Sequence, residues 1–105
     1  MEYIIVFITV PNFDVGEKIG STLVEEKLAA CVNITSQIKS LYFWKGNVEN
    51  DSEYLLIIKT RKDKFENLEK RVKEIHPYEV PEIVAIPIIL GSKDYLDWID
   101  ETLDR

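Results

Sequence analysis

Apolar and polar positions recur with two different periods along this chain, and the shorter period predicts four strands. Residues 3–10 and 53–60 are rich in apolar side chains on both faces of the expected strand, as in strands that are covered on both sides. Between Val32 and Trp44 five apolar residues fall on even positions, which predicts a strand with one apolar face, followed by a glycine turn: Val32, Ile34, Ile38, Tyr42 and Trp44. Residues 80–90 predict a fourth strand, where Pro87 indicates an edge or a bulge.

Three segments carry a helical period instead, and each begins with a capping residue. Asp14 predicts a helix from about Val15 to Ala30, and Asp63 predicts a second helix that ends before Pro77. A glutamate three residues after each aspartate completes a capping box. Ser92 predicts a short terminal helix. The apolar stripes of the three helices are Val15, Ile19, Leu23 and Leu28; Phe65, Leu68, Val72 and Ile75; and Tyr95, Trp98, Ile99 and Leu103.

The order of the elements predicts a ferredoxin-like fold. Strand, helix, strand, strand, helix and strand, with an extra helix at the end, form the split βαβ arrangement. Right-handed crossovers place the first and third strands in the middle of the sheet, and these are the strands that are apolar on both faces. We therefore expect one α+β domain over residues 1–105. Both long helices cover the same face of such a sheet, so its second apolar face predicts an obligate homo-oligomer.

Composition and charge narrow the classes of partner. The 105 residues carry a net charge of -6, which argues against nucleic acid and against an anionic membrane as partners. No apolar run approaches the length of about 18 residues that a spanning helix needs, and the first ten residues lack the features of a signal peptide, so a cytoplasmic protein is expected. The single cysteine excludes an internal disulfide, and the lack of a phosphate loop or nucleophile motif argues against an enzyme.

The stretch "IHPYEVPEI" at residues 75–83 holds the one histidine of the chain and is the candidate metal site. A neutral imidazole suits copper, nickel and zinc, and copper(II) binds such sites most tightly. Glu79 and Glu82 could add oxygen ligands, although a closed site needs three or four protein ligands. The alternative is structural. His76 ends the second predicted helix, where an imidazolium favours the negative end of the helix dipole and can donate to free carbonyls.

Five motifs together resemble the CutA divalent-cation tolerance proteins, and they cover nearly the whole chain in the same order. The resemblance implies a homotrimer of ferredoxin-like domains whose sheets enclose a central core. It also implies a link to the tolerance of divalent metals, copper especially, with no obligatory cofactor and no enzymatic activity. The motifs are "EEKLAACVNI" (25–34), "SLYFWKGNVENDSE" (40–53), "IIKT" (57–60), "HPYEVPEI" (76–83) and "DYLDWI" (94–99).

The same resemblance weakens the case for a tight copper site. Some bacterial members of the resembled family place a cysteine in the first strand and a second histidine just before the HPY motif. Here those positions are Ile8 and Ile75, so only the position of His76 is kept. Weak binding of copper or another divalent cation is therefore the first functional hypothesis.

The second hypothesis is a trimeric signalling or scaffold protein. Trimers of this design also resemble the nitrogen-regulatory signalling proteins, which hold small effectors in clefts between subunits. The candidate cleft residues are Tyr42, Trp44, Lys59 and Tyr78. The alternatives are that Tyr42 and Trp44 are core or subunit contacts, and that Lys59 extends to solvent from an apolar stem. Cys31 is interpreted as a small buried hydrophobe.

Overall fold

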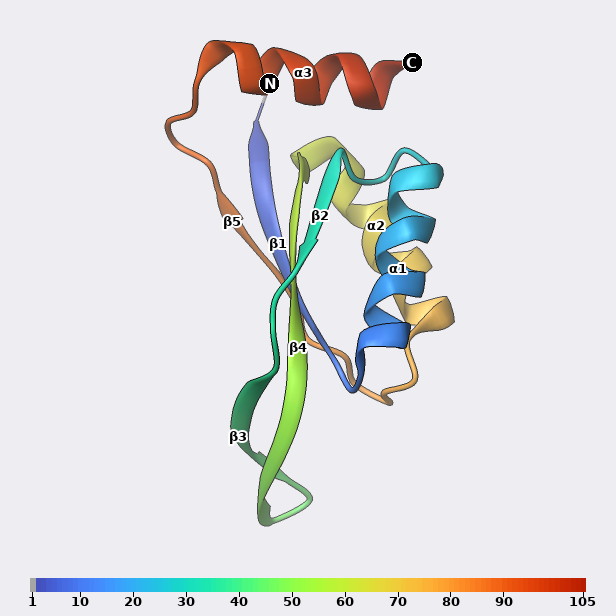
Figure 1. The fold of residues 1–105 in the computed structure, drawn as a ribbon, viewed down its shortest axis with the longest axis vertical. Coiled ribbons are helices and arrows are strands. Elements are labelled where there is room, and N and C mark those ends of the chain that lie inside the picture. The colour runs from blue at the N-terminus through green and yellow to red at the C-terminus, as the bar shows by residue number, and fades with distance from the viewer. Residues whose placement is uncertain (1) are drawn as a thin grey trace.

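The computed structural model describes residues 2–105 and has the predicted order of elements, with one predicted strand divided in two (Figure 1). Helices α1 and α2 lie side by side on one face of the sheet, and α3 crosses one end of it. The elements are β1 (Tyr3–Val10), α1 (Phe13–Glu25), β2 (Cys31–Ile34), β3 (Ile38–Trp44), β4 (Asn47–Arg61), the short 3-10 helix η1 (Lys62–Lys64), α2 (Phe65–Ile75), β5 (Ile83–Pro87) and α3 (Lys93–Asp104).

The sheet has the strand order that the sequence predicts. Its path is β2-β4-β1-β5, and every described pair is antiparallel. The two strands with apolar residues on both faces, β1 and β4, are therefore in the middle, which confirms the split βαβ arrangement. Strand β4 is 15 residues long, and β3 pairs only with its first half, so the two form a hairpin that projects from the domain (Figure 1).

The first helix begins earlier and ends earlier than predicted. Its N-cap is Asn12, whose side chain accepts a hydrogen bond from Val15 N at 2.9 Å, so the assignment of Asp14 as the cap was wrong. The helix ends at Glu25 rather than near Ala30, because Lys27 adopts a left-handed conformation with φ of 60°.

The second helix lacks the predicted cap but ends where expected. Asp63 lies in η1 and accepts a hydrogen bond from Arg61, and the N-cap position is Lys64, which makes no side-chain cap. The predicted capping box here was wrong. The helix ends at Ile75, as the following proline predicts.

Of the two remaining boundary predictions, one was wrong and one is confirmed. The fourth predicted strand is shorter than expected, since β5 covers five residues rather than 80–90. Ser92 caps α3 by accepting a hydrogen bond from Tyr95 N, as predicted.

The predicted strand from Val32 to Trp44 is interrupted at residues 35–37. There the backbone N–H of Thr35 donates to the carbonyl oxygen of Leu55, and the hydroxyl of Thr35 accepts a hydrogen bond from Leu55 N. These two bonds replace regular strand pairing. At the far end, Lys45 and Gly46 both have positive φ, 51° and 84°, as a two-residue type I′ hairpin turn requires.

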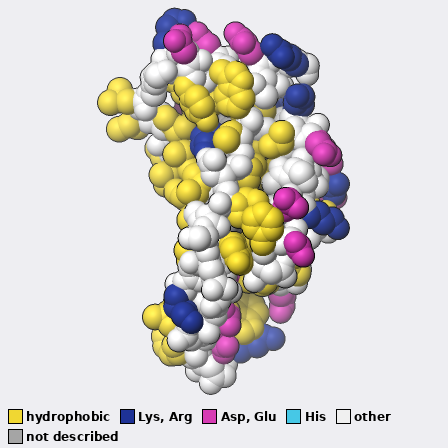
Figure 2. Space-filling model, in the orientation of Figure 1, with side chains coloured by type: hydrophobic (Ala, Val, Ile, Leu, Met, Phe, Trp, Pro, Cys, Tyr) yellow, Lys and Arg dark blue, Asp and Glu magenta, His cyan; other side chains and the backbone are white. Residues whose placement is uncertain are grey.

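The two faces of the sheet differ in what covers them. One face packs against α1 and α2, whereas the other, called the open face below, carries apolar side chains from β1, β4 and β5 that no helix covers except at the α3 end. Figure 2 shows hydrophobic side chains gathering on the side away from α1 and α2. On β5, Val84 and Ile86 are half exposed. In the described chain, no helix is long and apolar enough to cross a membrane.

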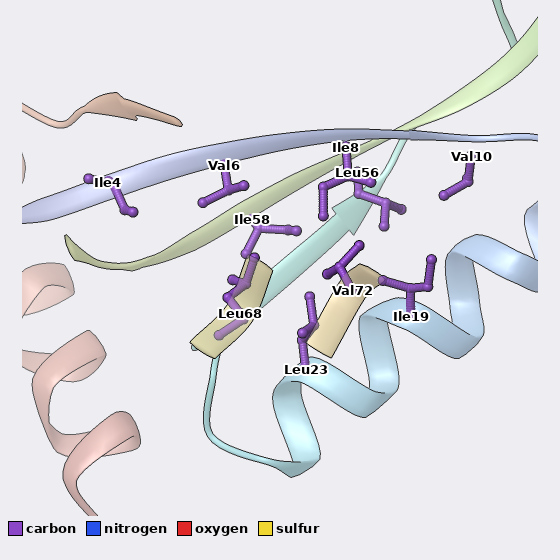
Figure 3. Packing of buried hydrophobic residues seen from close by; sticks show 11 residues of the cluster. Ile4, Val6, Ile8, Val10, Ile19, Leu23, Leu56, Ile58, Leu68 and Val72 are labelled. Carbon is purple, nitrogen blue, oxygen red and sulfur yellow. The ribbon is translucent and has the colours of Figure 1, made fainter. Parts of the chain in front are cut away.

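The core fills the space between the covered face and the two long helices (Figure 3). Alternate residues of β1 and β4 point into it, which is the period of two expected for strands. Gly16 and Gly20 let α1 approach closely, because a Cβ on Gly20 would lie 3.1 Å from Val32 Cγ1. The fully or almost fully buried members are Ile4, Val6, Ile8, Val10, Ile19, Leu23, Ala29, Leu56, Ile58, Leu68 and Val72.

Candidate functional site

A pocket of about 650 Å³ lies between the hairpin and the turn that follows α2. It is at this place that the sequence segments "SLYFW" and "HPYEVPE" meet. Most of the predicted site residues line it, which the spacing of the two segments along the chain does not reveal. The lining residues are Thr9, Ser40, Leu41, Tyr42, Trp44, Glu53, Pro77, Tyr78, Glu79, Val80 and Glu82.

His76 lies beneath this pocket rather than in its wall. The residue is 7% exposed, its Nε2 is 2.8 Å from the carbonyl oxygen of Thr9, and Tyr78 N donates to its Nδ1 at 3.1 Å. Since Nδ1 accepts a hydrogen bond, Nε2 carries the proton and donates it to Thr9. The imidazole is thus neutral and joins the end of β1 to the turn after α2.

This geometry bears on both sequence interpretations of the histidine. His76 is the C-cap of α2, as the structural alternative expected, but its ring donates to a carbonyl of β1 and not to the carbonyls of its own helix. Both ring nitrogens already have backbone partners, so a metal would have to displace one of them.

The three predicted metal ligands do not form one ligand set. Glu79 and Glu82 line the pocket, and His76 does not. Within residues 2–105, no group of three or more histidine, cysteine, aspartate or glutamate side chains is arranged to hold a metal ion. Weak copper binding by His76 with Glu79 or Glu82 stays a prediction, and any such site would have few protein ligands.

Two phenols in the pocket each donate to a carboxylate of β4. The Tyr78 hydroxyl donates to Glu53 Oε2 at 2.6 Å, and the Tyr42 hydroxyl donates to Asp51. Burial and the bond to Glu53 raise the pKa of Tyr78, and the bond to Asp51, followed by burial, raises the pKa of Tyr42 to about 12. Both tyrosines are therefore hydrogen-bond donors at neutral pH.

The pocket is acidic and partly aromatic. Glu53, Glu79 and Glu82 line it, and Lys45 at the hairpin turn pairs with Glu79. Lys45 Nζ lies 4.0 Å from Glu79 Oε2 and 5.6 Å from the ring centroid of Trp44. Both partners of the ion pair are largely exposed, so it contributes little to stability. It does show that an ammonium fits between these two side chains.

The predicted cleft residues separate into two places. Tyr42, Trp44 and Tyr78 line the pocket, whereas Lys59 lies on the open face, where its Nζ donates to Asn33 Oδ1. Glu53 was missed by sequence reasoning because the third strand was expected to start there, whereas β4 begins at Asn47. The run "ENDSE" before the apolar stretch was the available signal, since polar residues of a strand hairpin alternate between its faces.

The antiparallel split βαβ sheet with a projecting hairpin defines a small ferredoxin-like α+β domain. Residues 4–102 match the family described as CutA1 divalent ion tolerance protein. The chain therefore belongs to the CutA1 family.

Individual relatives agree with this assignment over most of the chain. The divalent-cation tolerance protein CutA of Thermus thermophilus is 53% identical over 92% of this chain and 94% of its own. The chloroplastic CutA of Arabidopsis thaliana is 52% identical over 91% of this chain, which spans only 53% of that protein. The structure of the periplasmic divalent cation tolerance protein CutA from Archaeoglobus fulgidus has a TM-score of 0.94 at 46% identity, covering 96% of this chain and 98% of that one.

Proposed function

We propose that this member of the divalent-cation tolerance family is a homotrimeric binding protein whose pocket takes a small organic cation, an amine or a guanidinium compound. The observation that carries this proposal is the convergence of three aromatic side chains and three glutamates on one pocket. Carboxylates attract a cation, and the faces of Trp44 and Tyr42 favour it through their quadrupoles. The volume of about 650 Å³ is in the ordinary range for small-molecule sites.

The contact made by Lys45 supports an ammonium ligand in particular. Its Nζ lies near both Trp44 and Glu79, so one wall of the pocket already accommodates a group of that chemistry. Because Lys45 is at an exposed turn, a ligand ammonium can take its place without a large cost in stability.

Weak binding of a divalent metal is the second candidate, favoured by the family and by Glu79 and Glu82. These two side chains offer oxygen ligands, which suit hard cations better than copper. His76 would add the imidazole that copper prefers only by giving up a backbone hydrogen bond. We therefore expect any metal to bind more weakly than the organic cation.

The homotrimer is proposed from the apolar surface that the single chain leaves uncovered. Half-exposed or exposed apolar side chains lie on β5, on the segments before and after it and on the hairpin. Exposed apolar surface of this extent is typical of a subunit interface. The most exposed residues of the set are Leu41, Phe43, Val48, Val80, Ile89 and Leu90.

Calorimetric titration with spermidine and with copper(II) tests the choice between the two ligands. Spermidine is expected to bind the unmodified protein, and a variant with both Glu79→Gln and Glu82→Gln should lose at least about tenfold in affinity. Glu101→Gln on α3, an exposed position outside the pocket, is the matched control and should bind normally. Tighter binding of copper than of spermidine, or equal spermidine affinity in the double variant, would contradict the proposal.

A further inference from the structure

The open face carries an ammonium group among apolar side chains. In the register of the sheet, Lys59 pairs with Cys31 on one side and with Ile5 on the other, and Ile5 pairs in turn with Ile86. Directly opposed residues of an antiparallel sheet share a face, so these four side chains form one row across the open face. Lys59 is thus at the centre of a surface that is otherwise mostly apolar.

The polar groups around this ammonium are arranged as donors. Both Lys59 Nζ and Cys31 Sγ donate to Asn33 Oδ1, the second at 3.9 Å. This uses the acceptor of the amide and leaves Asn33 Nδ2, a group with two N–H donors, without a hydrogen-bond partner among residues 2–105. Tyr95 of α3 lies beside Cys31, and burial followed by the neighbouring thiol raises the pKa of its phenol. Its hydroxyl therefore keeps its proton at neutral pH.

Among the described residues, the ammonium of Lys59 has no carboxylate partner. The chain has 19 acidic and 13 basic residues, yet in the part that the structure describes no carboxylate lies within 4.0 Å of Lys59 Nζ. When the open face is covered in an oligomer, the ammonium loses water, and an unpaired buried charge is costly. A cation together with free N–H donors is the arrangement that binds an anion.

We infer that Lys59 and Asn33 form a binding site for a small anion that carries a phosphate or carboxylate group, and that a second copy of the chain closes it. The inference rests on the oligomer in the proposed function, because the site is open to solvent on a single chain. It is independent of the cation pocket, which lies at the hairpin.

Thermal unfolding with inorganic phosphate or acetate, each compared with chloride at equal ionic strength, provides the test. A ligand that binds only the folded protein raises its melting temperature. We expect phosphate or acetate to raise it for the unmodified protein, and the stronger of the two identifies the preferred anion. Lys59→Met should abolish the increase and should also raise the melting temperature in chloride, because it removes an unpaired ammonium from a covered face.

Two further variants keep the test decisive. Lys70→Met, at an exposed position on α2, is the matched control and should respond to the anions as the unmodified protein does. Asn33→Leu, at an exposed strand position, should weaken the response even if Lys59→Met does not fold. No increase with either anion, or an equal increase in the Lys59 and Lys70 variants, would overturn the inference.

Light scattering and a spermidine titration on the same samples separate this result from the proposed function. A trimer that binds spermidine but shows no anion effect refutes the anion site alone. A monomer that shows no anion effect refutes the closure by a second copy and the oligomer together.

Discussion

His76 has two possible roles, metal ligand and structural hydrogen-bonding group, and the sequence and the structure favour different ones. The sequence makes it the best available metal ligand, whereas in the structure its two nitrogens satisfy Thr9 O and Tyr78 N. A buried backbone group that loses its partner costs about 1–3 kcal/mol. His76 therefore holds the floor of the pocket in place, which is a contribution to binding that does not require contact with the ligand.

Replacing His76 with alanine should lower the free energy of unfolding by about 2–4 kcal/mol, because two buried backbone groups lose their partners. Denaturation in urea measures this change. Glu82→Ala, which removes a pocket carboxylate without a hydrogen bond among the described residues, should change stability by less than about 0.5 kcal/mol. Equal effects of the two substitutions would refute the structural role of the imidazole.

The two tyrosines of the pocket provide a matched pair. Glu53 is only 5% exposed, so Tyr78→Phe leaves a buried carboxylate oxygen without its donor and should cost about 1–3 kcal/mol. Asp51 is exposed, and water can replace the phenol there, so Tyr42→Phe should cost less than about 1 kcal/mol. Urea denaturation of both variants gives the comparison. A larger loss for Tyr42→Phe would mean that the hairpin, and not the turn after α2, determines the shape of the pocket.

Helix α3 is attached to the end of the sheet by a buried arginine. Arg61 has a side chain only 4% exposed, and its guanidinium donates to Asp63, Asp100 and Asp104 at 2.8–3.3 Å. Tyr3 donates to Asp100 as well, at 2.6 Å. These contacts fix α3 over the end of the open face, and so they also hold Tyr95 beside Cys31, which pairs with Lys59 in the sheet.

The attachment of α3 should weaken in acid. The bond from Tyr3, with Arg61 also contributing, lowers the pKa of Asp100, and the bond from Arg61 lowers the pKa of Asp104. A lowered pKa in the folded state gives stability that is present above the unfolded value of about 3.9 and is lost as the pH falls through the folded value. We expect the free energy of unfolding to decrease as the pH is lowered below about 4.

Measuring unfolding in urea from pH 7 to pH 2 checks this dependence. The double variant Asp100→Asn and Asp104→Asn should be less stable at pH 7 and should show a smaller decrease in acid. The control, Asp94→Asn in the first turn of α3, should keep the slope of the unmodified protein. An unchanged slope in the double variant would exclude these two carboxylates as its source.

The elements that could be predicted from the sequence are those whose pattern reflects burial. Strand β1 is found with both ends correct, and the last residue of α2 follows from the proline. Capping was predicted less well, because several nearby side chains can accept a bond from a helix N-terminus. Asn12 and Asp14 are both suitable acceptors, and only the backbone path into α1 decides between them.

The candidate site shows a different limit. Tyr42, Trp44, Tyr78, Glu79 and Glu82 were identified singly, yet their assembly into one pocket depends on how far the hairpin extends. The position of Lys59 follows from strand register, which a single sequence fixes only where a face is clearly polar or apolar. Here both faces of β4 are apolar, so the separation of Lys59 from the pocket became evident only in the structure.

The described chain, residues 2–105, is elongated, with extents of 44 × 26 × 23 Å, because the hairpin projects beyond the sandwich. This hairpin, called the arm below, buries little apolar surface against its own chain, since its residues Leu41 and Phe43 are 68% and 76% exposed. Arm and open face together leave two apolar surfaces on one small domain. In a closed ring every copy buries both surfaces, whereas an open linear assembly leaves them exposed at its ends. This favours a cyclic assembly.

Static light scattering should give about three times the chain mass of 12.2 kDa for the unmodified protein. Phe7→Asp introduces a charge on the open face opposite Ile57, where a monomer can hydrate it but a buried interface cannot, so this variant should dissociate and still show the circular dichroism of a folded chain. Val24→Asp, on the exposed side of α1, should remain trimeric. If Phe7→Asp keeps the mass of the unmodified protein, the open face is not the interface, and the anion site on it would have no second copy to close it.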